Sequence, residues 1–300
     1  MQKARPPPPP PRPKPKSLSS NTVSPAPSSV NVSATRRKRG LGWPWDQPST
    51  HFKLYEPHAG TAGRGRISWL FNWECWTPDA VPQGIEWIPC VRTASNARDQ
   101  LDPSLTDIIQ NRGIKTTALL GFNEPEIPEQ ANLGVDEAVR LWRDVVVPVK
   151  RKFGLRLGSP GVSSDVGRSK PWLDAFLAQL HGHDEIDFLV VHWYGLHFAD
   201  MRAFLEDMHA SYNRLPVWVN EFACSRMGSG GEASAEEVEV FMREALPWLD
   251  GCEWIERYAY FGNKDVGAWV GRGNNFTEEG GPIETDGKRL TRVGRLYCEL

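Results

Sequence analysis

Eight short apolar runs, separated by longer amphipathic or polar stretches, limit the fold of this chain more than any other feature. From Gly40 onward, each run is at most eight residues long and rich in β-branched and aromatic residues, as buried parallel strands are. The runs cover residues 41–45, 67–73, 85–91, 117–122, 155–162, 187–194, 216–222 and 257–261. Eight strands that alternate with helices over roughly 260 residues predict an α/β fold, a single-domain (β/α)8 TIM barrel.

Helical patterns fill several of the gaps between these runs. Residues 135–152 carry an apolar stripe at i, i+3 and i+4 spacing, and residues 201–212 and 233–249 follow the sixth and seventh runs. Ser234, with two glutamates in the next turn, marks the start of the last of these helices. An open doubly wound sheet is the alternative, but no GxGxxG motif follows the first strand.

Residues 1–39 differ in composition from the rest and are predicted to form a disordered, proline-rich basic tail before a domain at 40–300. The tail carries nine Lys or Arg and no acidic residue, and it has no apolar segment typical of a signal peptide. It could act as a spacer, as a cleaved pro-segment or as a ligand for SH3-type domains. The remaining chain has 26 basic and 37 acidic residues, which argues against a nucleic-acid partner. No apolar run reaches the ~18 residues of a membrane helix, so no membrane partner is expected.

A glutamate stands at the end of two of the predicted strands. Glu124 follows the fourth run in the sequence GFNEPE, and Glu221 lies near the end of the seventh run in WVNEFA. In an eight-stranded barrel, strands four and seven lie on opposite sides of the mouth, so the two carboxyl groups are expected to meet there. Two carboxyl groups about 5 Å apart are what retaining glycoside hydrolysis requires.

Four ordered motifs resemble glycoside hydrolase family 128, a family of the clan A retaining glycoside hydrolases. They are GFNEPE (121–126), VHWYG (191–195), WVNEFA (218–223) and the closing DGKRLTRVGRLY (286–297). The resemblance implies that Glu124 is the acid/base, that Glu221 is the nucleophile and that Asn123 binds the sugar 2-hydroxyl. It further implies that Tyr194 orients Glu221 and that the substrate is β-1,3-glucan. The third predicted strand, with the sequence EWIPCVR at 86–92, departs from the family pattern, which leaves the groove beside it and the cleavage mode open.

Further residues near strand ends are candidates for binding the substrate. His192 lies two residues before Tyr194 and therefore on the same face of its strand, although it could also be a core histidine bonded to the backbone. Trp73, Trp193 and Tyr260 are expected to stack on sugar rings. We expect Glu126 to be a surface or capping residue and Glu74 to form a salt bridge. The five cysteines show no zinc-like spacing, and we expect neither a metal nor a cofactor.

The sequence thus predicts an endo-β-1,3-glucanase of the retaining type, expected as a monomer outside the cell or in the cell wall. One alternative is a glucan-binding protein without catalytic activity on the same scaffold. Another is a retaining β-glycosidase that cleaves a different linkage, because two glutamates alone do not select one. An interaction protein that works through its proline-rich tail is a third alternative.

Overall fold

The computed structural model describes residues 38–60, 65–180, 185–212 and 215–300 of the chain. The predicted tail therefore lies outside the described residues up to position 37. Lys38 and Arg39, which composition assigned to the tail, belong to the barrel. The Lys38 ammonium donates to the carbonyl oxygens of Leu249 and Cys252, and Arg39 opens the first strand. Burying these two side chains requires partners that only the folded domain supplies.

Eight parallel strands form the barrel, one at each predicted run. They are β1 (Arg39–Gly42), β2 (Ile67–Phe71), β3 (Glu86–Trp87), β4 (Ala118–Leu119), β5 (Arg156–Leu157), β6 (Leu189–Gly195), β7 (Val217–Cys224) and β8 (Ile255–Tyr260). Six of them pair in the order β3-β2-β1-β8-β7-β6, and β4 pairs with β5. Single bridges between Cys90 and Leu120 and between Gly158 and Phe188 join the two sheets, so the ring of strands closes.

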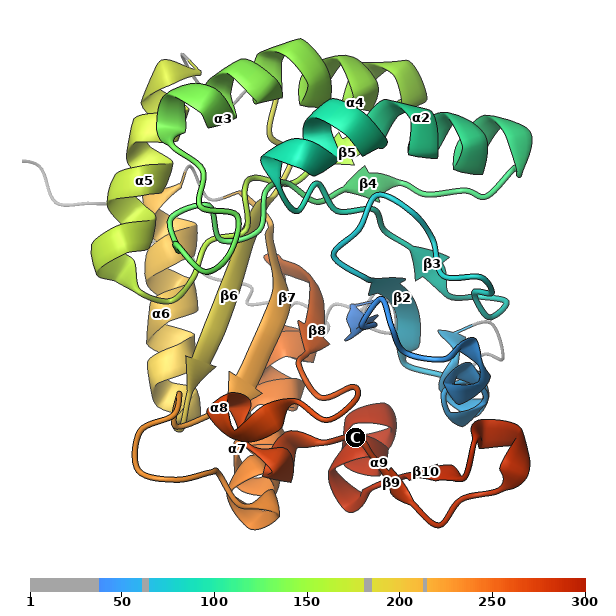
Figure 1. Cartoon of the computed structure of the whole chain (residues 1–300). Helices are drawn as coiled ribbons and strands as arrows, with labels where there is room; N and C mark the ends of the chain where they lie inside the picture. Colours follow the sequence, from blue (N-terminus) through green and yellow to red (C-terminus); the bar gives the residue numbers. More distant parts are fainter. Residues whose placement is uncertain (1–37, 61–64, 181–184, 213–214) are drawn as a thin grey trace, which may run out of the picture. The chain divides into compact units, whose positions relative to one another are not determined.

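Helices cover the outside of the strands (Figure 1). The longer ones are α5 (Val166–Gln179), α6 (Phe198–Ser211) and α7 (Ala235–Gly251), together with two series of consecutive helical segments. The first series joins η4 (Asn96–Gln100), α2 (Leu101–Leu105) and η5 (Thr106–Asn111). The second series joins α3 (Val135–Leu141), η6 (Trp142–Val146) and α4 (Val147–Phe153). All three predicted helices are confirmed, and the Ser234 side chain caps α7 through a capping box with Glu237.

The first two strands are not followed by full helices. Between β1 and β2, the described residues form only the short turns η1 (Ser49–Leu54) and η2 (Glu56–His58), and the loop at 72–85 between β2 and β3 has no helix. After β8 the chain forms α8 (Gly267–Val270), η7 (Arg272–Asn274), the hairpin of β9 (Thr277–Glu279) and β10 (Lys288–Leu290) around η8 (Ile283–Thr285), and finally α9 (Arg292–Glu299). No helix among the described residues is long and apolar enough to cross a membrane.

The hydrophobic core has two layers, as the alternation of side chains along each strand requires. The smaller layer fills the barrel and contains Trp69, Phe71, Ile88, Cys90, Ala118, Leu120, Phe188, Val190, Trp218 and Ala259. The larger layer lies between the strands and the helices. All five cysteines are free thiols. Because side chains fill the barrel, a pocket can open only at one of its ends.

Candidate active site

A pocket of about 480 Å³ opens at the carboxyl ends of the strands. Its walls are formed by Pro44, Trp45, Trp73, Arg92, Asn123, Glu124, Gln130, Tyr194, Glu221, Phe261, Val266, Trp269 and Val270. These residues come from segments that follow most of the strands, from β1 to β8. The pocket therefore exists only because the barrel closes.

A β-bulge in β7 turns Glu221 into this pocket. Val219 pairs with Val191, but the next residue of β6, His192, pairs with Glu221, so Asn220 is an extra residue on β7. Both Val219 and Phe222 pack in the outer core layer, whereas Glu221 lines the pocket. Such a bulge re-aims a side chain that strict alternation would have pointed elsewhere.

Glu124 reaches the pocket through a strained backbone conformation. Its φ is +45°, in the left-handed region that residues other than glycine rarely adopt. The backbone N–H of Glu124 donates to the Gly161 carbonyl oxygen at 2.7 Å, and the N–H of Asn123 donates to the Arg92 carbonyl oxygen at 3.0 Å. Neighbouring strand ends on both sides thus hold this conformation in place, a pattern common at functional sites.

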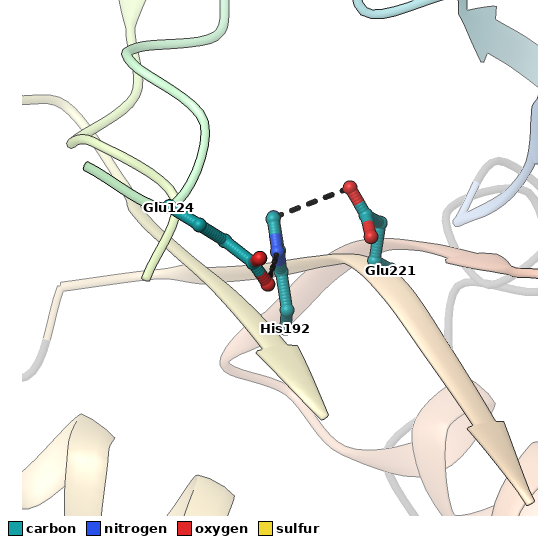
Figure 2. A group of neighbouring side chains, drawn as sticks. All are labelled: Glu124, His192 and Glu221. Atoms are coloured by element: carbon teal, nitrogen blue, oxygen red, sulfur yellow. Dashed lines mark hydrogen bonds and ion pairs between the residues drawn. The ribbon is translucent and has the colours of Figure 1, made fainter. Parts of the chain in front are cut away.

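The His192 imidazole lies between the two carboxyl groups (Figure 2). Its Nδ1 is 2.7 Å from Oε1 of Glu124, and its Nε2 is 3.7 Å from Oε1 of Glu221. The ring is fully buried, so the two glutamates are the groups that determine its charge. The prediction that His192 faces the same way as Tyr194 is confirmed, and its ring bonds a carboxylate rather than the backbone.

Two donors fix the carboxylate of Glu221. The Trp73 indole N–H donates to Oε1 at 2.5 Å, and the Tyr194 hydroxyl donates to Oε2 at 2.8 Å. An indole N–H can only donate, so the oxygen that it faces must be an acceptor. Gly42 makes room for the Trp73 ring, because a Cβ at this position would lie 2.9 Å from that ring. The arrangement favours the ionised form of Glu221.

Burial and charge act in opposite directions on these groups. Burial raises the pKa of Glu221, and the nearby Glu124 acts in the same direction, while His192, Trp73 and Tyr194 oppose the rise. Burial alone would lower the pKa of His192, but the charge of Glu221 and the hydrogen bond with Glu124 raise it to about 9. Burial and the adjacent Glu221 hold the pKa of Tyr194 well above its usual range, so its hydroxyl stays a donor.

The same three side chains could also offer ligand atoms to a divalent cation. One atom each from Glu124, His192 and Glu221 lies within 4.8 Å of the other two. However, Trp73 and Tyr194 already donate to both oxygens of Glu221, and an indole N–H repels a cation at that oxygen. The contacts therefore favour two carboxyl groups that are each held by hydrogen bonds from other side chains over a metal site.

The structure brings most of the predicted site residues together. Asn123, Glu124, Tyr194, Glu221 and Trp73 all line the pocket, with His192 buried between the two glutamates. In addition, the Nδ2 of Asn123 faces Oε1 of Gln130 at 3.5 Å.

Two predicted sugar-stacking residues are not at the pocket, and this prediction was wrong. Trp193 is only 4% exposed and stacks on Phe241 of α7, so it faces the helical layer. Tyr260 is fully buried, and its hydroxyl bonds the backbone N–H of Cys224. Both errors have one cause, since a strand residue next to an inward-facing one points outward.

The predictions for two other glutamates, Glu74 and Glu126, had different outcomes. The expected salt bridge of Glu74 is confirmed, because Oε1 accepts from Arg92 Nη2 at 2.8 Å. Glu126 was expected to be a surface or capping residue; it is half-buried rather than at the surface, and its Oε1 accepts from the backbone N–H of Ser163 at 2.7 Å. It does not line the pocket.

Several pocket residues were not singled out from the sequence. Arg92 directly follows the third apolar run, so its position at a strand end was a usable signal. Gln130 comes from the loop after β4, Val266 from the segment between β8 and α8, and Trp269 from α8 itself, and only the fold brings them to the pocket. Trp45, for which the sequence favoured no role, lies at the rim and is 64% exposed.

Comparisons with known proteins agree with this geometry. The chain is 28% identical to a curdlan-specific exo-β-1,3-glucanase from Blastomyces gilchristii, which belongs to subgroup III of glycoside hydrolase family 128 and was solved with glucose. The match covers 89% of this chain and 100% of that one, with a TM-score of 0.68. A subgroup II endo-β-1,3-glucanase from Sorangium cellulosum is 26% identical, with 87% and 97% of the two chains covered and a TM-score of 0.66.

A curated relative is the Alkali-sensitive linkage protein 1 of Schizosaccharomyces pombe. It is 29% identical over 234 residues, which are 77% of this chain and 40% of that protein. The chain thus spans less than half the length of this relative.

The family model described as "Glycosyl hydrolase catalytic core" matches residues 40–297, the whole barrel together with its paired glutamates. The chain therefore belongs to the glycosyl hydrolase catalytic core family, and its structural neighbours are β-1,3-glucanases of glycoside hydrolase family 128.

Proposed function

We propose that this protein is a retaining β-1,3-glucanase that cleaves within the glucan chain, with Glu124 as acid/base and Glu221 as nucleophile. The observation that carries the proposal is the spacing of the two carboxyl groups in the pocket, whose facing atoms lie within 4.8 Å of each other. Retaining enzymes place these groups about 5–5.5 Å apart, whereas inverting enzymes need about 6.5–9.5 Å to admit a water molecule.

The hydrogen bonds support the assignment of the two roles. Glu221 receives donors on both oxygens, which stabilises the anion that a nucleophile requires. Glu124 is held at Oε1 by His192, which leaves Oε2 as the oxygen that can reach the glycosidic oxygen. Asn123 precedes Glu124 and lines the pocket, where its amide can bind the sugar 2-hydroxyl.

In the first step, the Glu221 carboxylate attacks the anomeric carbon while Glu124 gives its proton to the departing glycosidic oxygen. The bond to the leaving sugar breaks, and a covalent ester between the glycosyl unit and Glu221 forms. Glu124, now ionised, then takes a proton from water, and the resulting hydroxide displaces Glu221 from the anomeric carbon. Two inversions restore the original β configuration.

The substrate class rests on the structural neighbours, because paired glutamates alone do not select a linkage. The neighbours with 26% and 28% identity are both β-1,3-glucanases, one endo-acting and one exo-acting. Trp45 and Trp269, which are 64% and 53% exposed at the pocket rim, could hold sugar units beyond the cleaved bond and so favour internal cleavage. Such a substrate would place the protein in a cell wall or outside the cell.

Incubation with laminarihexaose tests this proposal. The wild type should release di- and trisaccharides with a β anomeric centre, followed by mass spectrometry and NMR, whereas release of glucose alone would indicate exo cleavage. Glu124→Gln and Glu221→Gln should each lower turnover by at least about 10³-fold because each removes one carboxyl group of the reaction. Saturable binding without any product would favour the glucan-binding alternative.

Glu126→Gln is the matched control, because Glu126 lies two residues from Glu124 but does not line the pocket. The glutamine can still accept the hydrogen bond from Ser163. It should retain most of the wild-type turnover. Equal losses in all three variants would contradict the assignment of Glu124 and Glu221.

A further inference from the structure

The two walls of the pocket differ in chemistry. One wall is apolar and follows β1 and β8, with Pro44, Trp45, Phe261, Val266, Trp269 and Val270. The opposite wall follows β3 and β4 and is polar, with Arg92, Asn123 and Gln130. A sugar ring between them would place one face on the aromatic side and its hydroxyl edge on the polar side.

Arg92 is the only cationic side chain among the described residues of this pocket wall. Its backbone carbonyl oxygen accepts from the N–H of Asn123, so it lies directly beside the strand end that carries Glu124. The side chain is 44% exposed, which leaves the guanidinium open to the pocket. Arg92 thus stands one strand away from the acid/base.

Buried partners fix the orientation of this guanidinium. Nη2 donates to Oε1 of Glu74 at 2.8 Å, and the Glu74 side chain is only 9% exposed. Oε2 of Glu74 accepts from Nδ2 of Asn96 at 3.0 Å, so Glu74 is itself held at both oxygens. Nη2 is the only nitrogen of the Arg92 guanidinium that has a hydrogen-bond partner among the described residues, so its Nε and Nη1 remain available as donors.

The charge of this site favours a neutral ligand. Glu74 compensates the charge of Arg92, and the two carboxyl groups of Glu124 and Glu221 line the same pocket. A carboxylate or phosphate on the ligand would lie near these acidic groups without an uncompensated cation to offset the repulsion. Sugar hydroxyls, which accept hydrogen bonds without a charge, fit this wall better.

We propose that Arg92, held by Glu74 and Asn96, is a sugar-binding residue that determines specificity: its free guanidinium N–H groups donate to hydroxyls of the glucosyl unit beside Glu124. This inference rests on the proposed function. Because the donors are oriented before the ligand arrives, little side-chain entropy is lost on binding.

Binding of laminaritriose, measured by calorimetry in the Glu221→Gln background to prevent turnover, tests the role of Arg92. Arg92→Met removes the donors and should weaken binding by about 10- to 100-fold, the effect of losing hydrogen bonds from a charged group. Arg92→Lys keeps the ion pair with Glu74 but not the planar fork, so it should fold normally and still bind at least about 5-fold more weakly.

Arg98→Met is the matched control, because Arg98 is 45% exposed and also pairs with a glutamate, Glu137, but does not line the pocket. It should bind as the parent protein does, and melting temperatures of all variants should show that they are folded. Unchanged binding by both Arg92 variants would overturn this inference alone. No binding of laminaritriose by the parent and the wild type would refute the proposed function and this inference with it.

Discussion

The charge of His192 makes a prediction that can be worked out from the structure. The ring is fully buried between Glu124 and Glu221, and its pKa is about 9 instead of 6.5, because the two carboxyl groups outweigh the effect of burial. In the unfolded chain, the same imidazole loses its proton near pH 6.5. Between about pH 6.5 and 9, the folded protein therefore keeps a proton on His192 that the unfolded chain has lost.

The sign of the effect on stability follows from linkage. Because the pKa is raised in the folded state, the stabilisation is fully present below pH 6.5 and is lost as the pH rises to about 9. At 1.36 kcal/mol for each pH unit, the difference amounts to roughly 3 kcal/mol. His192→Gln removes this contribution, so the free energy of unfolding of the variant should depend much less on pH in this range.

Urea unfolding at pH 5.5, 7, 8 and 9 measures the effect. The difference in stability between the wild type and His192→Gln should shrink by roughly 3 kcal/mol from the lowest to the highest pH. His209→Gln serves as control, because His209 stacks on Trp254 outside the pocket and its Nδ1 contacts the Leu215 carbonyl oxygen. Parallel stability curves for the wild type and His192→Gln would refute the reasoning.

Two further predictions concern hydrogen bonds to Glu221, and a third concerns the ion pair of Arg39 with Asp250. Tyr194→Phe removes a donor that favours the charged form of Glu221, so the pKa of Glu221 should rise. The acidic limb of the pH–rate profile should therefore move to higher pH, and kcat/KM should fall about 10- to 100-fold. An acidic limb at an unchanged pH would contradict this prediction. Trp73→Phe removes the donor to the other oxygen and should shift the same limb in the same direction, whereas a change in KM alone would indicate a purely substrate-binding role. Arg39→Met leaves Asp250 without its buried partner and should lower the free energy of unfolding by about 3–5 kcal/mol in urea titrations, and a loss below about 1 kcal/mol would show that Arg66 compensates.

The positions of the strands could be predicted because each is a compact apolar run bounded by polar residues. All eight runs overlap a strand, and of the two catalytic candidates, Glu124 follows β4 and Glu221 lies inside β7, near its carboxyl end. The alternation of strands with helices is incomplete after β1, where the described residues form only η1 and η2, and after β2, where residues 72–85 form a loop whose packing the local sequence does not reveal. The tail boundary at 39 was misplaced because composition cannot show that Arg39 is paired with Asp250, more than two hundred positions away.

Side-chain direction at the strand ends was predicted only in part. His192 and Tyr194 share a face, as period two requires, and the same rule places Trp193 on the opposite face. Glu221 breaks the rule, because a bulge at Asn220 shifts the register of β7. No residue type in WVNEFA reveals this bulge, which arises from pairing with a strand from elsewhere in the chain.

The sequence by itself determined that the chain forms eight buried strands and that a carboxyl group follows strand four and another ends strand seven, because hydrophobic periodicity is a local property. The tertiary structure alone decided that these carboxyl groups lie on either side of His192, that Trp73 and Tyr194 hold one of them, and that Arg92 lines the same pocket as the apolar wall. These contacts join segments far apart in sequence, and they depend on barrel closure, on strand register and on backbone strain at Glu124, none of which is encoded in any short stretch of residues.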